Sequence, residues 1–197
     1  MPTFDQPIAD LLISFGHEKT SSENEADFFM FSGGVDIDPR VYNAQRHEKV
    51  HSTNPSRDLR EAFYFYKAKL SNTPCAGICR GFQFLCAMNG VKLIQHLEGR
   101  YSNHPITLVD TSFDKKSITV NSSHHQAVPF EATDALSLRS YAYSMDLSKH
   151  KTAIIEAGFS ADRRFAGVQY HPEWQGCGAE GVAYFRHQLS QLLNNSN

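Results

Sequence analysis

The stretch of residues 73–90 constrains the fold of this chain more than any other feature. A short apolar run ends at Cys79, which lies between Gly77 and Gly81, and residues with helical spacing follow at once. This order predicts a strand, a tight turn and a helix. In a nucleophile elbow, small residues on either side of the central residue allow the sharp turn that pushes its side chain clear of the sheet. We therefore expect Cys79 to lie in such a turn, at the N-terminus of a helix.

That position would give Cys79 a reactive thiol. Unpaired N–H groups and the helix dipole stabilise an anion there, so the thiolate becomes a usable nucleophile near neutral pH. The alternative is a buried structural cysteine at a strand end, and the pattern alone does not exclude it. The other three cysteines, Cys75, Cys86 and Cys177, have no metal-ligand spacing and are too few for a disulfide scaffold. Reduced thiols are therefore expected.

Length and charge limit the classes of protein to which the chain can belong. With 197 residues, 41% of them hydrophobic, residues 1–197 are expected to form a single domain around one central sheet. A net charge of -2 and a pI near 6.5 provide no basic surface for nucleic acid or anionic lipid. The sequence has neither a membrane-length apolar run nor a secretion signal at its start. We expect a cytoplasmic protein with no nucleic-acid or membrane partner.

The pattern of apolar residues predicts strands alternating with helices. Residues 27–31 form a continuous apolar run, which is typical of parallel strands covered on both faces. Other strands are expected at residues 11–15, 74–78, 91–97, 106–109, 117–120, 135–141, 153–157 and 165–170. Helices are expected after Cys79, at residues 56–70 and at residues 181–193. The helix at residues 56–70 would be capped by Ser56 or Asp58. Its apolar stripe is expected to pack in the core and comprises Leu59, Ala62, Phe63, Tyr66 and Leu70.

Three groups of functional residue types follow predicted strands. Gly33 and Gly34 follow residues 27–31, Cys79 follows the next apolar run, and His171 and Glu173 follow residues 165–170. The carboxyl ends of parallel strands converge on one crevice, so these groups can meet. His171 would then take the thiol proton of Cys79, and the carboxylate of Glu173 would orient the imidazole. The N–H of Arg80 and one from the glycine pair would bind an oxyanion, although a simple turn also explains two glycines.

Two motifs carry a resemblance to a known family. Residues 77–83 and 167–174 resemble the class I glutamine amidotransferases and are most similar to the gamma-glutamyl-gamma-aminobutyrate hydrolase branch. Residues 32–39, 57–61 and 120–126 favour the same branch, so five ordered motifs cover residues 28–174. The resemblance implies an α/β fold of three layers, in which a mostly parallel central sheet carries helices on both faces, as in flavodoxin.

The resemblance also implies roles for individual residues. Cys79 would be the nucleophile, His171 and Glu173 would complete the triad, and Gln83 would help to hold the substrate. The branch assignment depends chiefly on Arg80 and on residues 124–126, where His124 and His125 either line the pocket or make structural hydrogen bonds. Arg57, Asp58 and Glu61 are expected to brace their helix, with contact to the substrate as the alternative.

The sequence departs from the family pattern in two places. Val35 replaces a third glycine, so Gly34 is favoured over Gly33 as the oxyanion donor. Only 32 residues precede Gly33, about half the usual number in the family, so the N-terminal part of the fold is expected to be shortened.

These observations predict a cysteine-dependent hydrolase that cleaves gamma-glutamyl amide bonds in a small-molecule substrate through a gamma-glutamyl thioester. No metal or organic cofactor is expected; His47 and His51, spaced i, i+4, lack a third ligand. The first alternative is a glutaminase subunit that supplies ammonia to a separate synthase, and the second is a non-catalytic binding protein of the same fold. Association into a homo-oligomer or with a synthase partner stays open at this point.

Overall fold

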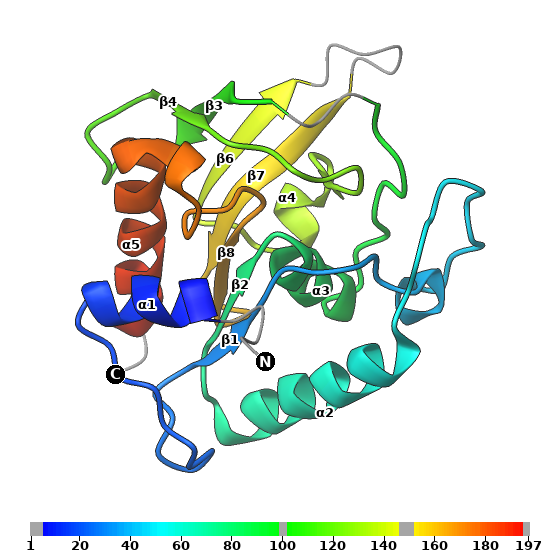
Figure 1. Ribbon diagram of the computed structural model, residues 1–197, viewed down its shortest axis with the longest axis horizontal. Helices are drawn as coiled ribbons and strands as arrows, with labels where there is room; N and C mark the ends of the chain where they lie inside the picture. The colour runs from blue at the N-terminus through cyan, green and yellow to red at the C-terminus, as the bar shows by residue number, and fades with distance from the viewer. Residues whose placement is uncertain (1–5, 99–101, 146–151, 195–197) are drawn as a thin grey trace.

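A mixed β-sheet forms the centre of the computed structural model, which describes residues 6–98, 102–145 and 152–194 (Figure 1). The strands run in the order β1-β2-β8-β7-β6-β3-β4, with β5 paired to β7 beside this path. Their bounds are β1 Phe29–Phe31, β2 Cys75–Ile78, β3 His104–Val109, β4 Ser117–Val120, β5 Val128–Pro129, β6 Ser140–Met145, β7 Ala153–Ser160 and β8 Phe165–Val168. The β1–β2 and β2–β8 pairs are parallel, and the other pairs are antiparallel.

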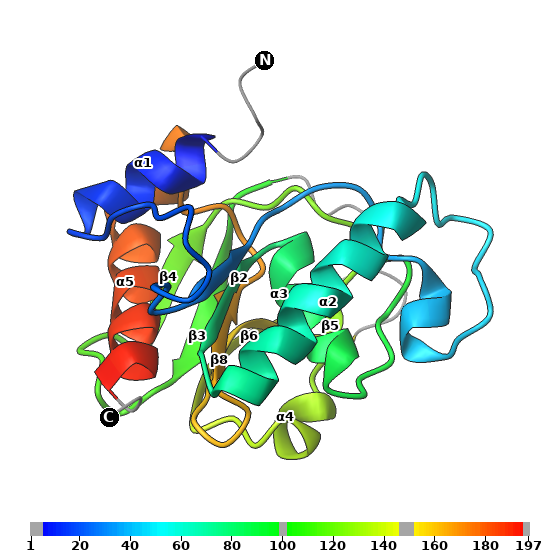
Figure 2. The ribbon, with the colours of Figure 1, turned by 90° about the horizontal axis from the view of Figure 1, so that it is seen from below.

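Helices cover both faces of the sheet, which confirms the predicted three-layer α/β class (Figure 2). Helices α2 (Pro55–Ser71), α3 (Arg80–Met88) and α4 (Ala132–Ala135) pack on one face, and α1 (Gln6–Ser14) and α5 (Gly178–Asn194) pack on the other. The direction of the strands differs from the prediction, because only the three strands that lead to the candidate site are parallel. Among the residues that the structure describes, no helix is both long and apolar enough to cross a bilayer.

The predicted strand at residues 11–15 is wrong, because residues 11–14 belong to helix α1 and Phe15 lies in the turn that follows it. Ile8, Leu11, Leu12 and Phe15 recur at helical spacing and contact the core beside α5. The rings of Phe15 and Phe185 lie 6.2 Å apart. A short apolar run fits a buried strand as well as a helix, and here the docking face offered by α5 decides between them.

Two other predicted strands are also corrected. Residues 91–97 form no strand and contribute only one bridge, between Ile94 and Ala127. Residues 135–141 contain the end of α4 and a turn with Ser137 at φ 52°, so strand β6 begins only at Ser140. The remaining predicted strands and helices are present with bounds shifted by a few residues, as is usual for sequence-based boundaries.

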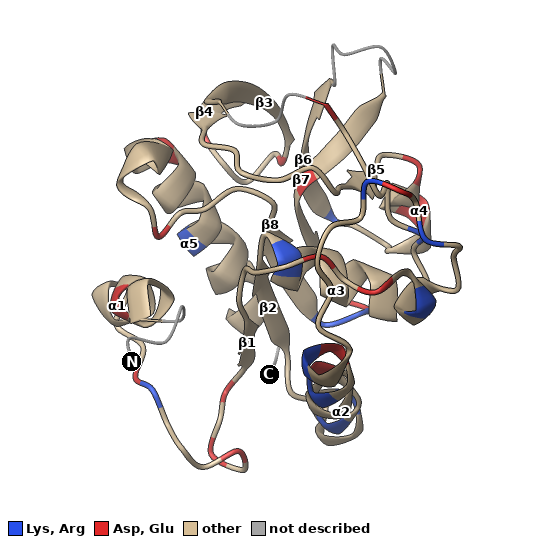
Figure 3. Ribbon diagram, turned by 45° about the vertical axis from the view of Figure 1, so that its right-hand side comes forward, with Lys and Arg blue, Asp and Glu red and all other residues tan. Residues whose placement is uncertain are grey.

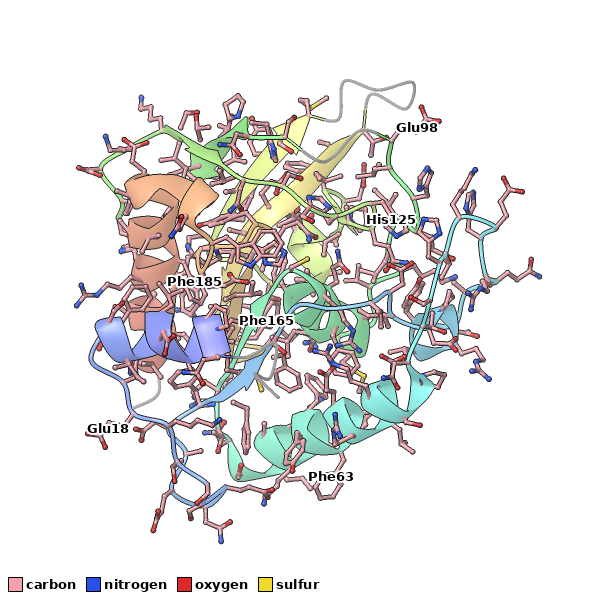
Figure 4. All side chains as sticks on the ribbon, in the orientation of Figure 1. Glu18, Phe63, Glu98, His125, Phe165 and Phe185 are labelled. Carbon is pink, nitrogen blue, oxygen red and sulfur yellow. The ribbon has the colours of Figure 1, made fainter. Side chains whose placement is uncertain are left out.

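Helix α2 is rotated relative to the prediction. Its N-cap is Asn54, whose side chain accepts a hydrogen bond from the Arg57 N–H at 3.0 Å, instead of Ser56 or Asp58. Asp58, Phe65 and Ala68 face the core. The predicted core stripe is instead largely exposed: Leu59 is 75%, Phe63 62%, Tyr66 56% and Leu70 90% accessible. Figure 4 shows Phe63 on the outer side of α2.

Charge explains the rotation of α2. Asp58 and Glu61 both pair with Arg80, which is buried at the start of α3. A buried arginine without anionic partners would cost several kcal/mol. The face of α2 that carries these two carboxylates therefore turns inward, and the apolar stripe opposite them turns out.

We expect the two faces of α2 to differ sharply in their effect on stability. Phe65→Ala empties a buried position and should cost about 3 kcal/mol or more of unfolding free energy. Phe63→Ala, the matched change on the exposed face, should cost less than about 1 kcal/mol. Urea unfolding followed by circular dichroism measures both. Equal losses would show that the stripe is buried against a neighbouring molecule in solution.

Candidate active site

The elbow around Cys79 has the geometry that its glycines predict. Strand β2 ends at Ile78, Cys79 adopts φ 52° and ψ -111°, and α3 begins at Arg80. A Cβ added at Gly77 would lie 2.5 Å from the Phe82 nitrogen, and one at Gly81 would lie 2.0 Å from the Phe31 carbonyl oxygen. Any larger residue would therefore push the backbone apart. A non-glycine residue at positive φ costs on the order of 1–3 kcal/mol, and such strain is common at catalytic turns.

His171 lies beside Cys79 and is oriented by Glu173. The Nδ1 of His171 and the Oε1 of Glu173 are 2.7 Å apart, and both side chains are nearly buried. With Nδ1 donating to this carboxylate, Nε2 is the ring nitrogen left for the thiol. Burial by itself would lower the pKa of His171, but hydrogen bonds with Cys79 and Glu173 raise it to about 9. The imidazole is therefore protonated at neutral pH.

Two neighbours hold His171 in place: Asn121, which was not identified from the sequence as a site residue, and Trp174, for which the sequence left pocket lining and packing open. The side chain of Asn121 accepts from the His171 N–H at 2.8 Å and donates to the His171 carbonyl at 2.9 Å. The ring of Trp174 stacks on the imidazole, with centroids 3.7 Å apart and planes within 6°. Asn121 comes directly after β4, so its place at a strand end was a usable signal.

The glycine loop after β1 reaches the same point. A Cβ added at Gly33 would lie 3.2 Å from the Cε1 of His171 and 3.9 Å from the Cβ of Cys79. Gly34 follows with φ +148°. The Arg80 N–H belongs to the first turn of α3, where backbone donors have no partner within the helix. The structure thus places both the glycine loop and Arg80, the two predicted sources of oxyanion donors, next to Cys79.

Gln83 is linked to Cys79 through another glutamine. Its Nε2 donates to the Gln126 carbonyl at 2.8 Å and to the Oε1 of Gln169 at 3.0 Å. Gln169 in turn donates to the Sγ of Cys79 at 3.6 Å. Both N–H bonds of the Gln83 amide are therefore used within the protein. Gln169 was missed from the sequence, although it comes directly after β8, and its place at a strand end was a usable signal.

The side chain of Arg80 is directed toward α2 and not toward the sulfur of Cys79. It is 1% accessible and forms ion pairs with Asp58 and Glu61 of α2. Burial raises the pKa of Asp58, and the charge of Arg80 opposes that rise. Figure 3 shows the acidic and basic segments that lie together on α2. The part of Arg80 that remains available to a substrate is its backbone N–H.

His124 and His125 both make hydrogen bonds within the protein. The Nδ1 of buried His124 is 2.8 Å from the Gln126 carbonyl. The Nε2 of His125 is 2.9 Å from the Oδ1 of Asp36, and its Nδ1 is 3.3 Å from the Nδ1 of His96. Burial, and then the neighbouring histidines, lower the pKa of His96. Across the described ranges, no three His, Cys, Asp or Glu side chains converge in a way that could hold a metal ion.

The other three thiols are poor nucleophiles. All four cysteines are free and buried. Burial raises the pKa of Cys75 and of Cys177 to about 12 and raises that of Cys86 well above its ordinary value. These thiols therefore stay protonated at neutral pH, and among the residues that the structure describes no imidazole is paired with any of the three.

Comparison with known proteins places this geometry in a family. A family model described as peptidase C26 matches residues 13–173. Protein NtpR of Enterococcus hirae is 32% identical over 83% of this chain and 74% of its own length. The "putative glutamine amidotransferase-like protein YvdE" of Lactococcus lactis subsp. lactis is 28% identical over 75% of this chain and 66% of its own. The chain thus spans about two thirds to three quarters of these two relatives.

Solved structures share the fold. A "putative GMP synthase subunit" from Thermoplasma acidophilum superposes with a TM-score of 0.63 at 16% identity, covering 98% of this chain and 88% of the other. A glutamine amidotransferase from Thermotoga maritima gives 0.52 at 14% identity, covering 92% of this chain and 75% of the other. At these identities the likeness concerns the fold alone.

Proposed function

This chain belongs to the peptidase C26 family, and we propose that it hydrolyses gamma-glutamyl amide bonds with Cys79 as nucleophile, His171 as acid and base, and Glu173 as the residue that orients the imidazole. Family membership indicates cysteine-dependent amide hydrolysis. The observation that carries the proposal is the placement of an imidazole with a raised pKa between a carboxylate and the sulfur at a positive-φ elbow.

The arrangement supports acylation of the cysteine. The Cys79 sulfur, whose proton His171 has taken, attacks the gamma-carbonyl carbon, and the carbonyl oxygen becomes an oxyanion. Backbone N–H groups of Gly34 and Arg80 are the proposed donors to that oxygen. When the C–N bond breaks, the Nε2 of His171 gives its proton to the departing amine. A gamma-glutamyl thioester is left on Cys79.

Hydrolysis of the thioester reverses the roles of the same groups. His171, now neutral, takes a proton from water while the water oxygen attacks the carbonyl carbon. The C–S bond breaks, glutamate leaves, and the sulfur is again paired with a protonated imidazole. Glu173 stabilises the imidazolium in both halves of the cycle.

Four free, buried cysteines fit a reducing compartment, which supports a cytoplasmic location.

The purified protein is expected to cleave gamma-glutamyl amides without a partner. The assay compares glutamine, gamma-glutamyl p-nitroanilide and gamma-glutamyl derivatives of small amines and amino acids with their alpha-linked isomers as controls. Release of amine from the gamma series alone supports the proposal, and equal cleavage of the alpha series overturns it.

A glutamine-like chloroketone separates the remaining alternatives. Labelling of Cys79 without turnover of any amide would favour a glutaminase that needs a synthase partner to complete its site. Absence of both labelling and turnover would favour a binding protein of the same fold.

A further inference from the structure

Arg57 of α2 contacts the loop that carries the proposed oxyanion donor. Its Nη1 donates to the Gly33 carbonyl at 3.0 Å, and its Nη2 donates to the Ser32 carbonyl at 3.0 Å and to the Ser32 hydroxyl oxygen at 3.1 Å. The side chain is 19% accessible. One guanidinium thus holds two consecutive carbonyl groups of the loop from the same side.

The orientation of these carbonyls also determines where the N–H groups point. A trans peptide is planar, and its C=O and N–H bonds point in opposite directions. No cis peptide occurs in the described part of the chain. Because Arg57 binds the Ser32 and Gly33 carbonyls, the N–H groups of Gly33 and Gly34 are directed away from Arg57. Gly33 itself lies against His171 and Cys79.

The side chain of Arg57 fills the space beside Gly34. A Cβ added at Gly34 would lie 2.2 Å from the Nη1 of Arg57 and 3.5 Å from the Cδ of Arg80. The guanidinium therefore occupies the volume that a side chain at position 34 would need. Arg57 and the absence of a side chain at Gly34 together allow this loop conformation.

Glu61 connects Arg57 to the other half of the site. The Nε of Arg57 donates to the Oε1 of Glu61 at 2.7 Å, and the Oε2 of Glu61 pairs with the Nη1 of Arg80. Asp58 pairs with the other terminal nitrogen of Arg80 and accepts from the Asp38 N–H at 3.1 Å. A single carboxylate thus links the arginine that holds the glycine loop to the arginine at the start of α3.

We propose that Arg57 is a positioning residue for the oxyanion site: by binding the Ser32 and Gly33 carbonyls it aims the Gly34 N–H at the oxygen of the tetrahedral intermediate, and Glu61 fixes Arg57 relative to the Arg80 N–H. This inference rests on the proposed function of Cys79 as an acylated nucleophile. Arg57 does not touch the reacting atoms. Its effect is on the transition state for acyl transfer.

Two reactions of Cys79 distinguish positioning from general damage to the site. Acylation by p-nitrophenyl acetate passes through an oxyanion and does not depend on the gamma-glutamyl pocket, whereas alkylation by iodoacetamide forms no oxyanion. Arg57→Ala should slow acylation by about 10²-fold or more, as loss of an oxyanion donor does, and leave alkylation within about twofold of wild type. With a gamma-glutamyl amide, kcat should fall by a similar factor and KM should change less than about threefold.

Two variants accompany Arg57→Ala. Arg57→Lys keeps the charge but lacks the planar fork, so it should recover part of the loss, about tenfold relative to Arg57→Ala. It also serves as the test if Arg57→Ala does not fold. Arg60→Ala, on the exposed side of the same helix, should match wild type in both reactions.

The outcomes separate this inference from the proposed function. If wild type is acylated by the ester but cleaves no gamma-glutamyl amide, the proposed substrate fails and the ester data still test Arg57. An Arg57→Ala protein whose acylation stays within about threefold of wild type overturns the inference. So does a parallel loss of acylation and alkylation, and so does a wild-type Cys79 that the ester does not acylate.

Discussion

Cys79→Ala is expected to abolish turnover of gamma-glutamyl amides, with a loss of at least about 10⁴-fold, because no other group in the site can form the thioester. Changing Cys75 or Cys177 to serine should leave kcat/KM within about threefold of wild type. Burial raises the pKa of both thiols to about 12, so neither supplies a competing thiolate. Initial-rate assays on these three single variants measure the effects.

Cys86→Ser is the informative control for Cys79→Ala. Cys86 is fully buried on α3, so the hydroxyl should cost about 1–3 kcal/mol of stability while catalysis by the folded fraction is retained. Iodoacetamide labelling mapped by mass spectrometry gives an independent reading of reactivity. Modification of another cysteine before Cys79 at neutral pH would contradict the assignment of the nucleophile.

His171→Ala should lose about as much activity as Cys79→Ala, because residues that act as one catalytic unit are strongly non-additive. Glu173→Gln should retain about tenfold to a hundredfold more activity than His171→Ala, since an orienting carboxylate usually contributes least. The comparison of kcat/KM for the two variants and their double mutant tests this order. If His124→Ala or His125→Ala were as damaging and His171→Ala were not, the triad would be redrawn.

The raised pKa of His171 predicts an alkaline limit to activity. The departing amine needs the proton on Nε2, so the rate should fall as pH rises through about 9 and the imidazolium is lost. Glu173→Gln removes one of the hydrogen bonds that raise this pKa and should move the limit to lower pH. Rate profiles of both proteins between about pH 6 and about pH 11, a range that covers the transition on both sides, provide the measurement.

The same group affects folding, and the sign follows from the direction of its shift. A folded-state pKa of about 9 lies above the ordinary value of 6.5. The hydrogen bonds of the protonated His171 imidazole therefore stabilise the fold fully below pH 6.5, and this contribution is lost as pH rises through about 9. The free energy of unfolding, measured with urea, should therefore decline more over that pH range for wild type than for His171→Ala.

The exposed apolar stripe on α2 lies opposite the carboxylates that form the buried ion pairs of this helix. Asp58 and Glu61 turn toward Arg80, and Glu61 also holds Arg57 against the glycine loop. The opposite face, with Leu59 and Phe63, is left in contact with solvent. The ion pairs with Arg80 and Arg57 thus take precedence over burial of apolar residues in this helix.

Local sequence signals were sufficient for the centre of the molecule. The glycines around Cys79 predict the elbow because only residues without a Cβ fit within 3 Å of the neighbouring backbone there. Polar residues after parallel strands predict one shared crevice, since β1, β2 and β8 end at the same edge of the sheet. His171 and Glu173 meet as predicted, but because β8 ends at Val168, a turn brings them together and not the period-2 alternation of a strand. Each of these inferences starts from a pattern of residues that are near one another in the chain, even where the strands themselves are far apart in sequence.

Features that depend on distant partners could only be decided by the tertiary structure. Residues 11–15 fit a strand or a helix until α5 offers a docking face, and the stripe of α2 fits the core until Arg80 attracts the opposite face. The sequence likewise left open whether His125 lines the pocket or makes a structural hydrogen bond. Its partner Asp36 lies 89 positions away in the chain. The sequence shows that an apolar or charged side chain needs a partner, but it does not show which residue that partner is. The partner is selected by the free energy of packing in the assembled core.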